Sequence, residues 1–469
     1  MSIKIKTPLR HILIARHDAI GDLILTLPAI AAIKSHFPDT KITVMTTAYN
    51  RDIIAHLPYI DEILVKPATH SFPLFIQFVK QLRSLKVDLM IHFRMTTEVA
   101  WAGFFGARHN IGDKSLLGLW PIFRRYGVFY RNHNRMNHVS EYNGILLKSL
   151  GISSRDCQEL AYTPPPGAIP LAKRLLASLG PRKNIPLICI HIGVGFGNRP
   201  IRANKYVEYI HLLRSQMDVD IYLSCYTDAE IAVCKEIQSQ VKGPLLTAYR
   251  QPIQTYIGLL SLMDLFVSVD TGPFHLAAAL KIPQLAIFPS KKVKPLSWGP
   301  FRNRHLICRN PYQCHHDCPH QQCPYDICSD DISVIDMVNK TQALLKGEGV
   351  SQQLEQREYW AQHSLSILVL YDEKTEDQAR QFYQQLQSWS FVSFISHVTK
   401  PDLYPFARQR DISVIHNFSG KRRGRLFWMT QRLISTLFFS PLLIHGPHSY
   451  ESLTELMATY QRQYGKKLL

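Results

Sequence analysis

The sequence has no uninterrupted apolar stretch of the roughly 20 residues that a membrane-spanning helix needs. The nearest candidate, residues 426–446, contains Gln431, Arg432 and Pro441. The basic amino-terminal segment carries only the apolar run HILIA, which is too short for the core of a secretory signal. We therefore expect a chain that is neither exported nor inserted across a bilayer, and whose 9 cysteines stay reduced in the cytoplasm.

Acidic residues are scarce, since 36 Asp and Glu stand against 54 Lys and Arg in 469 residues and give a formal net charge of +18. Such a field attracts nucleic acids, phosphorylated substrates or an anionic membrane surface. The sequence shows no basic motif interleaved with aromatic residues, no signature of a nucleic-acid-binding fold, and neither repeats nor low-complexity tracts. We therefore expect no nucleic-acid partner.

The closely spaced C-x2-C pair of many zinc sites is absent from the cysteine-rich stretch between Cys308 and Cys328. Four cysteines there follow the spacing C-x3-C-x4-C-x4-C with histidines nearby, and thiolate and imidazole groups suit zinc. The unusual spacing makes a bound metal the less favoured alternative. The four residues that would hold zinc are Cys314, Cys318, Cys323 and Cys328.

Short apolar runs alternate with amphipathic segments through most of the chain, and this alternation predicts βαβ units with mostly parallel sheets. The sequence TPPPG at residues 163–167 interrupts the alternation, because three consecutive prolines fit neither a helix nor a central strand. We place a domain boundary there. The predicted strands are 11–15, 41–47, 87–93, 187–193, 220–225, 265–269 and 284–288, and the predicted helices are 23–37, 75–85, 204–216 and 273–280.

A polar stretch after Gly347 precedes a third segment of the usual size for one domain. Within it, the basic and apolar residues 420–439 form either a helix at an anionic lipid surface or a core helix behind a charged loop. The predicted strands here are 366–372, 411–418 and 441–446, and the predicted helices are 376–387 and 452–464. The sequence thus predicts two doubly wound α/β domains at 1–165 and 166–348, a linker at 349–363 and a small α/β module of unassigned role at 364–469.

Two turns from a strand into a helix carry the residues best suited to chemistry, since ligands of such sheets bind beyond the carboxyl ends of the strands. In the first turn, within ARHDAIGDLILTLPAI, Gly21 lets a ligand approach the main chain. Asp22 stands near the start of the following helix, whose free N–H groups favour anions. The residue types leave two interpretations of Asp22 open, a helix N-cap or a carboxylate base that faces the cleft.

The second turn lies in SVDTGPFHLAAALKIPQLAIF, where a strand ends at Asp270 and Pro273 suits the start of a helix. The amino-terminal end of a helix that follows Thr271 and Gly272 is a ready anion site. His275 lies two residues beyond Pro273 and can reach the same anion. This set of residues at one helix start favours phosphate binding over an ordinary capped helix.

The stretches AIGDLILTLPAIAAIKSHFP and VDTGPFHLAAALKIPQLAIF together resemble glycosyltransferase family 9, the lipopolysaccharide heptosyltransferase family. Weaker pieces follow in the expected order, namely DLMIHFRMTTEVAWAGFFGARHNIG, HIGVGFGNRPIRANKYVEYIHLL and LSWGP. The resemblance covers about residues 8 to 346 and leaves the last part of the chain unassigned. It implies a GT-B fold, in which two Rossmann-like domains face each other across a cleft.

The resemblance also implies the reaction. Members of this family move a heptose from an ADP-linked donor to the lipopolysaccharide core, invert the anomeric centre and need no metal or other cofactor. Asp22 falls where the family's catalytic base lies, and inversion needs a carboxylate that deprotonates the attacking acceptor hydroxyl. The implied donor-binding residues are Gly193, Gly195, Arg202, Asp270, Thr271, Gly272, His275 and Lys291, and the implied acceptor-binding residues are His17, Gly21, Arg94 and Arg135.

Some positions depart from the family's usual pattern. Arg202 replaces a lysine, Asn204 and Lys205 replace Trp-Pro, and PSKK at residues 289–292 replaces Gly-Pro-Thr. These departures leave open another nucleotide sugar, another glycan acceptor, or a relative that only binds a nucleotide or anion. The implied partners are a nucleotide sugar and an anionic lipopolysaccharide precursor. We therefore expect a protein that is peripheral on the cytoplasmic face of the inner membrane, with the apolar residues 116–123 either against lipid or in a buried helix.

Overall fold

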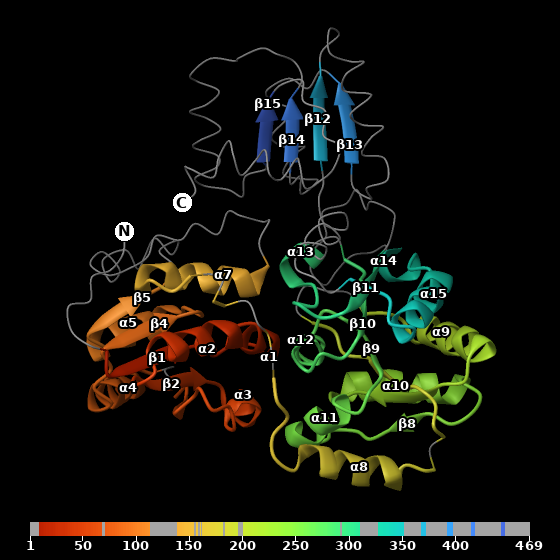
Figure 1. Ribbon diagram of the computed structural model, residues 1–469, viewed down its shortest axis with the longest axis horizontal. Coiled ribbons are helices and arrows are strands. Elements are labelled where there is room, and N and C mark those ends of the chain that lie inside the picture. Colours follow the sequence, from red (N-terminus) through yellow and green to blue (C-terminus); the bar gives the residue numbers. More distant parts are fainter. Residues whose placement is uncertain are drawn as a thin grey trace.

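The computed structural model of the chain is drawn in Figure 1. It describes residues 9–67, 71–112, 138–153, 156–157, 160, 162–181, 183–195, 200–290, 293–309 and 327–350, and four strands between residues 367 and 445 by their backbone. No helix in this part of the chain has both the length and the apolar character needed to cross a membrane.

The first sheet has five parallel strands in the order β3-β2-β1-β4-β5. Strands β1 and β4 are buried along their whole length, which fits their continuous apolar sequences in a parallel sheet with helices on its faces. The strands are β1 (His11–Ala15), β2 (Lys41–Thr46), β3 (Glu62–Val65), β4 (Leu89–His92) and β5 (His109–Ile111). The accompanying helices are α1 (Ile20–Ile24), α2 (Leu27–His36), α3 (Ala48–Ile54), α4 (Phe72–Ser84), α5 (Thr97–Gly106), α7 (Val139–Leu146) and the 3-10 helix η2 (Leu147–Leu150).

The single helix expected at residues 23–37 is wrong, because the chain forms the two helices α1 and α2 there. Pro28 lies in the first turn of α2. In a continuous helix Pro28 would have no N–H to donate to the carbonyl of Ile24, and its ring would clash with that carbonyl. Helix α1 begins earlier than expected, at Ile20, so Asp22 lies in its first turn.

The second sheet has six parallel strands in the order β11-β10-β9-β6-β7-β8. Strands β6, β9 and β10 are completely buried, as their apolar runs predict. The strands are β6 (Leu187–His191), β7 (Asp220–Ser224), β8 (Leu246–Thr247), β9 (Leu265–Val269), β10 (Gln284–Phe288) and β11 (His305–Arg309). The helices are α8 (Ala168–Ser178), α9 (Ala203–Gln216), α10 (Asp228–Gln240), α11 (Ile253–Leu260), α12 (Gly272–Ala279), α13 (Pro295–Trp298), α14 (Ile327–Asp330) and α15 (Val334–Leu345).

The third sheet has four parallel strands in the order β13-β12-β14-β15. They are β12 (Ile367–Tyr371), β13 (Val392–Ser396), β14 (Val414–Asn417) and β15 (Leu442–His445). Strands β12, β14 and β15 coincide with the three strands predicted for this module. The helices expected at 376–387 and 452–464, and the segment 420–439, lie outside the described residues.

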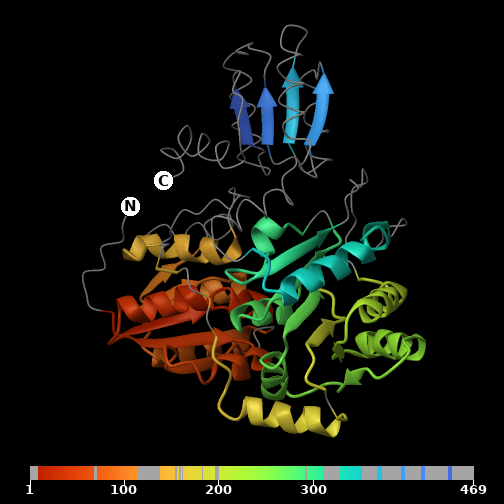
Figure 2. The same cartoon turned by 45° about the vertical axis from the view of Figure 1, so that its right-hand side comes forward.

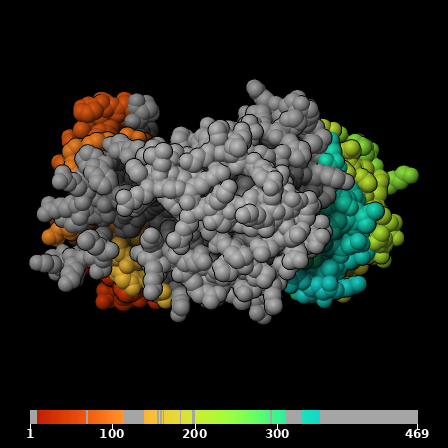
Figure 3. Space-filling model, turned by 90° about the horizontal axis from the view of Figure 1, so that it is seen from above, coloured from red at the N-terminus to blue at the C-terminus, as the bar shows by residue number. Residues whose placement is uncertain are grey.

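We call the elements around the first sheet the first lobe and those around the second sheet the second lobe; they lie side by side in Figures 1 and 2. Seen from above, the two lobes emerge at opposite ends of the molecule (Figure 3). One cluster of buried apolar side chains runs through both lobes. Tyr162, between them, donates its N–H to the carbonyl of Ala279 at 3.2 Å and its hydroxyl to the carbonyl of Ile53. The expected α/β architecture, two parallel-sheet lobes and a small additional module, is confirmed.

Candidate active site between the two lobes

In the turn from β1 into α1, Asp22 forms an ion pair with Arg16. Helix α1 begins at Ile20, and its N-cap residue Ala19 makes no side-chain capping bond. Arg16, at the carboxyl end of β1, donates from Nη2 to Asp22 Oδ1 at 2.8 Å and from Nε to the Asp22 carbonyl at 3.0 Å. The N-cap interpretation of Asp22 is therefore wrong, and its carboxylate is paired with Arg16 while 25% of the side chain stays exposed.

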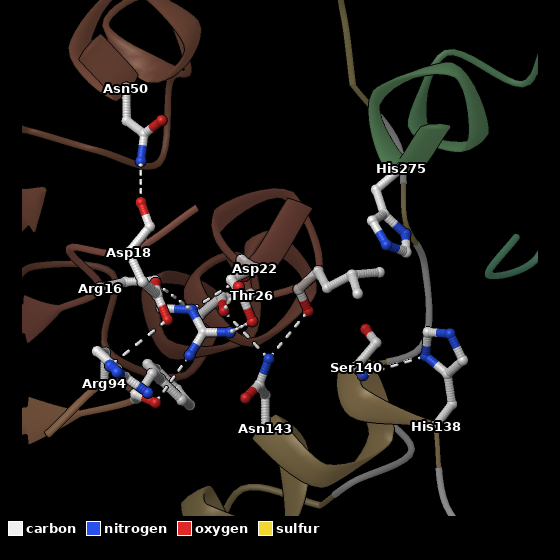
Figure 4. Close-up of polar contacts among 12 residues, drawn as sticks. Arg16, Asp18, Asp22, Thr26, Asn50, Arg94, His138, Ser140, Asn143 and His275 are labelled. Atoms are coloured by element: carbon white, nitrogen blue, oxygen red, sulfur yellow. Dashed lines mark hydrogen bonds and ion pairs between the residues drawn. The ribbon is translucent and has the colours of Figure 1, made fainter. Parts of the chain in front are cut away.

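A second carboxylate, Asp18, lies beside the same arginine (Figure 4). Asp18 Oδ1 is 3.3 Å from Arg16 Nε, and Asp18 Oδ2 is 3.9 Å from Arg94 Nε. Burial raises the pKa of Asp18 to about 6, against the opposing effect of Arg16, and the charge of Asp22 raises it further. Asp18 is not among the predicted site residues, although it stands only four residues before Asp22.

The turn from β9 into α12 forms a capped helix start. The Thr271 hydroxyl accepts a hydrogen bond from the Phe274 N–H at 3.3 Å. His275 Nε2 lies 2.8 Å from Asp270 Oδ1, and the histidine side chain is almost fully buried. Asp270 therefore orients His275, and the helix start combines a positive dipole end with an imidazole held in one position.

The two turns meet directly. A Cβ atom added to Gly21 would lie 2.6 Å from His275 Cδ2, and one added to Gly272 would lie 2.9 Å from Ile20 Cβ. Both glycines thus let α1 of the first lobe pack against α12 of the second lobe. Figure 4 shows Asp22 and His275 on these facing elements. The structure brings the two motifs into one place.

Of the remaining residues predicted to bind the donor, two are tightly packed glycines and one is a half-exposed arginine. A Cβ atom on Gly195 would collide with the main-chain oxygen of Asp270, so the chain after β6 runs directly against the α12 turn. Gly193 packs in the same way against the His191 ring. Arg202 is half exposed and its Nη1 lies 3.2 Å from Asp330 Oδ2.

Of the remaining residues predicted to bind the acceptor, His17 is buried and Arg94 is exposed. His17 is buried, and its Nε2 has no hydrogen-bond partner among the described residues. Burial, followed by the charge of Lys66, lowers its pKa to about 4, so His17 is neutral near pH 7. Arg94 is 54% exposed beside Asp18.

Some expected site residues lie outside the described part of the chain. These are Lys291, Arg135, Cys314, Cys318 and Cys323, together with the side chain of Cys328 and residues 116–123. Among the described residues, no group of three or more His, Cys, Asp or Glu side chains is arranged to hold a metal ion.

A cavity of about 850 Å³ lies beyond the carboxyl ends of β6, β7 and β8, where ligands of parallel sheets bind. Both lobes line it, since Ile20, Tyr49 and Asp52 come from the first lobe and Tyr226 and Arg250 from the second. Tyr49 and Tyr226 are each about half exposed, and the pKa of Tyr49 is raised by burial and then by the neighbouring Tyr226. These residues are not among the predicted site residues, and the only sequence signal for them is the position of the strand ends at Ser224 and Thr247.

A buried polar chain forms part of the cavity wall. His191 Nδ1 lies 3.0 Å from the Ser224 hydroxyl, which donates to the Tyr256 hydroxyl at 3.0 Å. Burial lowers the pKa of His191 to about 4 and raises that of Tyr256. Both rings are therefore uncharged near neutral pH, and the cavity offers neutral hydrogen-bonding groups and tyrosine rings beside Arg250.

Comparisons with known proteins agree on one family and one fold. A family model described as "Glycosyltransferase family 9 (heptosyltransferase)" matches residues 77–327. Lipopolysaccharide heptosyltransferase 3 of Escherichia coli is 26% identical over 302 residues, which cover 60% of this chain and 84% of that protein. A family 9 glycosyltransferase structure from Veillonella parvula has a TM-score of 0.62 at 16% identity, covering 74% of this chain and 100% of that one. E. coli ADP-heptose lipopolysaccharide heptosyltransferase II has a TM-score of 0.58 at 16% identity, covering 72% and 99% respectively. These likenesses show the two-sheet GT-B fold.

Proposed function

The chain belongs to glycosyltransferase family 9, and from this premise we propose that it moves a heptose from ADP-heptose to a lipopolysaccharide core acceptor, with inversion at the anomeric carbon. The observation that carries the proposal is the contact between the starts of α1 and α12, in which Gly21, the residue before Asp22, packs against His275. The names of the relatives support the substrates, since one is an ADP-heptose enzyme and another a lipopolysaccharide heptosyltransferase.

On the acceptor side, Asp22 acts as the general base. Its carboxylate takes the proton of the acceptor hydroxyl while the hydroxyl oxygen attacks the anomeric carbon from the face opposite the leaving group. Arg16 donates to both the carboxylate and the carbonyl of Asp22 and fixes the base in position. The positive Arg94, exposed nearby, suits an acceptor that carries phosphates or acidic sugars.

On the donor side, the bond between the anomeric carbon and the diphosphate oxygen breaks and leaves ADP. The diphosphate gains negative charge as this happens, and the amino-terminal end of α12 faces that charge with its dipole and with His275. We place the nucleoside in the adjoining cavity, against Tyr226 and Arg250. Lys291, which follows β10 by three residues in the sequence, and Arg202 are further candidates for the diphosphate.

Two finer features belong to this proposal. Transfer proceeds without a metal ion, since the helix start and fixed cations supply the positive charge that a metal would otherwise provide. The protein works at the cytoplasmic face of the inner membrane, because its acceptor is a lipid-anchored precursor and its net charge of +18 favours an anionic surface.

The experiment is a transfer assay with a panel of nucleotide sugars and truncated lipopolysaccharide acceptors, read by the mass gained by the acceptor. We expect a gain of one heptose from ADP-heptose, and we expect it to persist in a chelator. Transfer from another nucleotide sugar alone would replace the donor assignment. Nucleotide binding without any transfer would support the non-catalytic alternative.

Asp22→Asn tests the base directly. The amide keeps the size of the side chain but accepts no proton, so we expect kcat to fall by a factor of about 10² to 10⁴ while donor binding changes little. The matched control is Asp39→Asn, at an exposed aspartate in the turn before β2. Unchanged turnover in Asp22→Asn would remove this residue from the mechanism.

A further inference from the structure

We propose that Asp18 is a positioning residue for transfer, which shares Arg16 with Asp22 and keeps the arginine's charge compensated when Asp22 takes up the acceptor proton. This inference rests on the proposed function, and it gives a role to the second carboxylate of the β1–α1 turn. It concerns a residue that does not itself accept the substrate's proton.

The geometry around Arg16 carries the inference. Arg16 is only 5% exposed, so its charge needs compensation from protein groups. Its Nη2 binds the Asp22 carboxylate at 2.8 Å, and its Nε lies between the Asp22 carbonyl at 3.0 Å and the Asp18 carboxylate at 3.3 Å. Its Nη1 donates to the carbonyl of Phe93 at 2.8 Å. One buried guanidinium thus serves two carboxylates.

The other groups that face Asp18 are either more distant than Arg16 or uncharged. From the end of β4, Arg94 Nε approaches Asp18 Oδ2 only to 3.9 Å, and this side chain is half exposed to solvent. From α3, the neutral amide of Asn50 donates to the carbonyl of Asp18 at 2.9 Å.

The remaining charges lie behind His17 or across the lobe contact. His17 is neutral near pH 7, and the Lys66–Glu98 pair beside it, 3.5 Å apart, is internally balanced. From the second lobe, His275 is paired with Asp270 at 2.8 Å. Arg16 is therefore the main cation for both Asp18 and Asp22.

The reaction changes this balance in one step. The acceptor O–H bond breaks, its proton goes to Asp22, the acceptor oxygen bonds to the anomeric carbon, and the diphosphate leaves with the electron pair of its bond. Asp22 is then neutral, and without Asp18 the buried Arg16 would lack a counter-ion at close range. An ionised Asp18 keeps Arg16 paired and makes proton uptake by Asp22 easier.

The first test compares Asp18→Asn with the wild type in kcat and KM from about pH 5 to about pH 9. With Arg16 paired to Asp22 alone, we expect a weaker base, a kcat about tenfold lower on the plateau and an acid limb shifted by about one unit to lower pH. Donor KM should stay within about twofold. Asp18→Glu, which restores the charge, should recover part of the rate.

A purely structural role would give a different result. Loss of rate at every pH with an unshifted acid limb, or equal rates in Asp18→Asn and the wild type, would overturn the inference. Asp39→Asn again serves as the control. If Asp18→Asn does not fold, Asp18→Glu and the following measurement still decide.

The second test needs no turnover. NMR of the aspartate carboxyl carbons follows the titration of Asp18 in the wild type, where its pKa is raised to about 6, and in Asp22→Asn. In the variant, Arg16 has Asp18 as its only carboxylate partner, and the negative charge of Asp22 is gone. We therefore expect the titration midpoint of Asp18 to fall toward the ordinary aspartate value. An unchanged midpoint would overturn the shared-arginine arrangement. If the midpoint falls but no nucleotide sugar is used, the coupling stands and the proposed function fails.

Discussion

The charge of Asp18 works against the stability of the fold. Its pKa rises from 3.8 to about 6, mainly through burial, so the folded protein holds the Asp18 proton more tightly than the unfolded chain does. The folded state is therefore favoured below about pH 4, and this advantage is lost as the pH rises through about 6. A buried carboxylate that destabilises the protein at neutral pH is typical of a functional site.

Asp18→Asn should therefore stabilise the protein in a pH-dependent way. The neutral amide removes the penalty of ionisation, so we expect the free energy of unfolding to rise by on the order of 1–2 kcal/mol near pH 8 and by only about a third as much near pH 4.5. Urea unfolding of both proteins at the two pH values measures this difference. A gain of the same size at both values would show that the effect is packing rather than charge.

The residues that the sequence alone identified are those of local motifs. Asp22, Thr271 and His275 each lie within a few residues of a strand end, and the short turns there fix their positions. Arg250 escaped notice because its place on the cavity depends on how two lobes far apart in the sequence pack together. The same holds for Arg16, whose interaction with Asp22 and Phe93 requires the folded turn and the neighbouring strand.

At the level of elements, every described strand that the sequence did not predict is an edge strand. These strands are β3, β5, β8, β11 and β13, and each ends a sheet in the strand order. Central strands are buried on both faces and so carry continuous apolar runs, whereas edge strand β3 is only partly buried along its length and β5 has 3 residues, of which His109 and Asn110 are polar. The break between α1 and α2 was overlooked because the apolar pattern continues through Pro28.

The packing of α11 on α8 gives a test of one such element. A Cβ atom on Gly258 would collide with the main-chain oxygen of Ala168 and lie 3.1 Å from the Ala172 Cβ. For Gly258→Ala we expect overpacking toward the upper end of about 1–3 kcal/mol, partly offset by roughly 1 kcal/mol of helix propensity. The unfolding midpoint in urea should fall, while Gln240→Ala, at the exposed end of α10, should leave it unchanged. An unchanged midpoint in Gly258→Ala would show that the two helices separate at little cost.

For the whole molecule, three buried histidines among the described residues contribute to the response to acid. Burial lowers the pKa of His17, His92 and His191 from 6.5 to about 4 in each case. The unfolded chain therefore binds protons at these residues below about pH 6.5, whereas the folded protein binds them only below about pH 4. Stability is present above that window and is lost as the pH falls through it.

We expect the free energy of unfolding to fall by several kcal/mol between about pH 6.5 and about pH 4, since each histidine contributes on the order of 2–3 kcal/mol. Denaturant unfolding at a series of pH values measures this fall. His92→Gln should make it shallower, whereas His36→Gln, at an exposed histidine near the end of α2, should leave the slope as it is. An equal slope in His92→Gln would remove this histidine from the acid response.

The apolar cluster that runs through both lobes restricts how such a protein diversifies. Each half also holds an apolar cluster of its own, but the shared cluster joins them, because Ile20 rests on Gly272 and Tyr162 bonds to both sides. A chimera that joined one half to the corresponding half of a relative would bring together two surfaces shaped for other counterparts. New specificities in this lineage are therefore more readily reached by changing cavity and loop side chains than by exchanging whole halves.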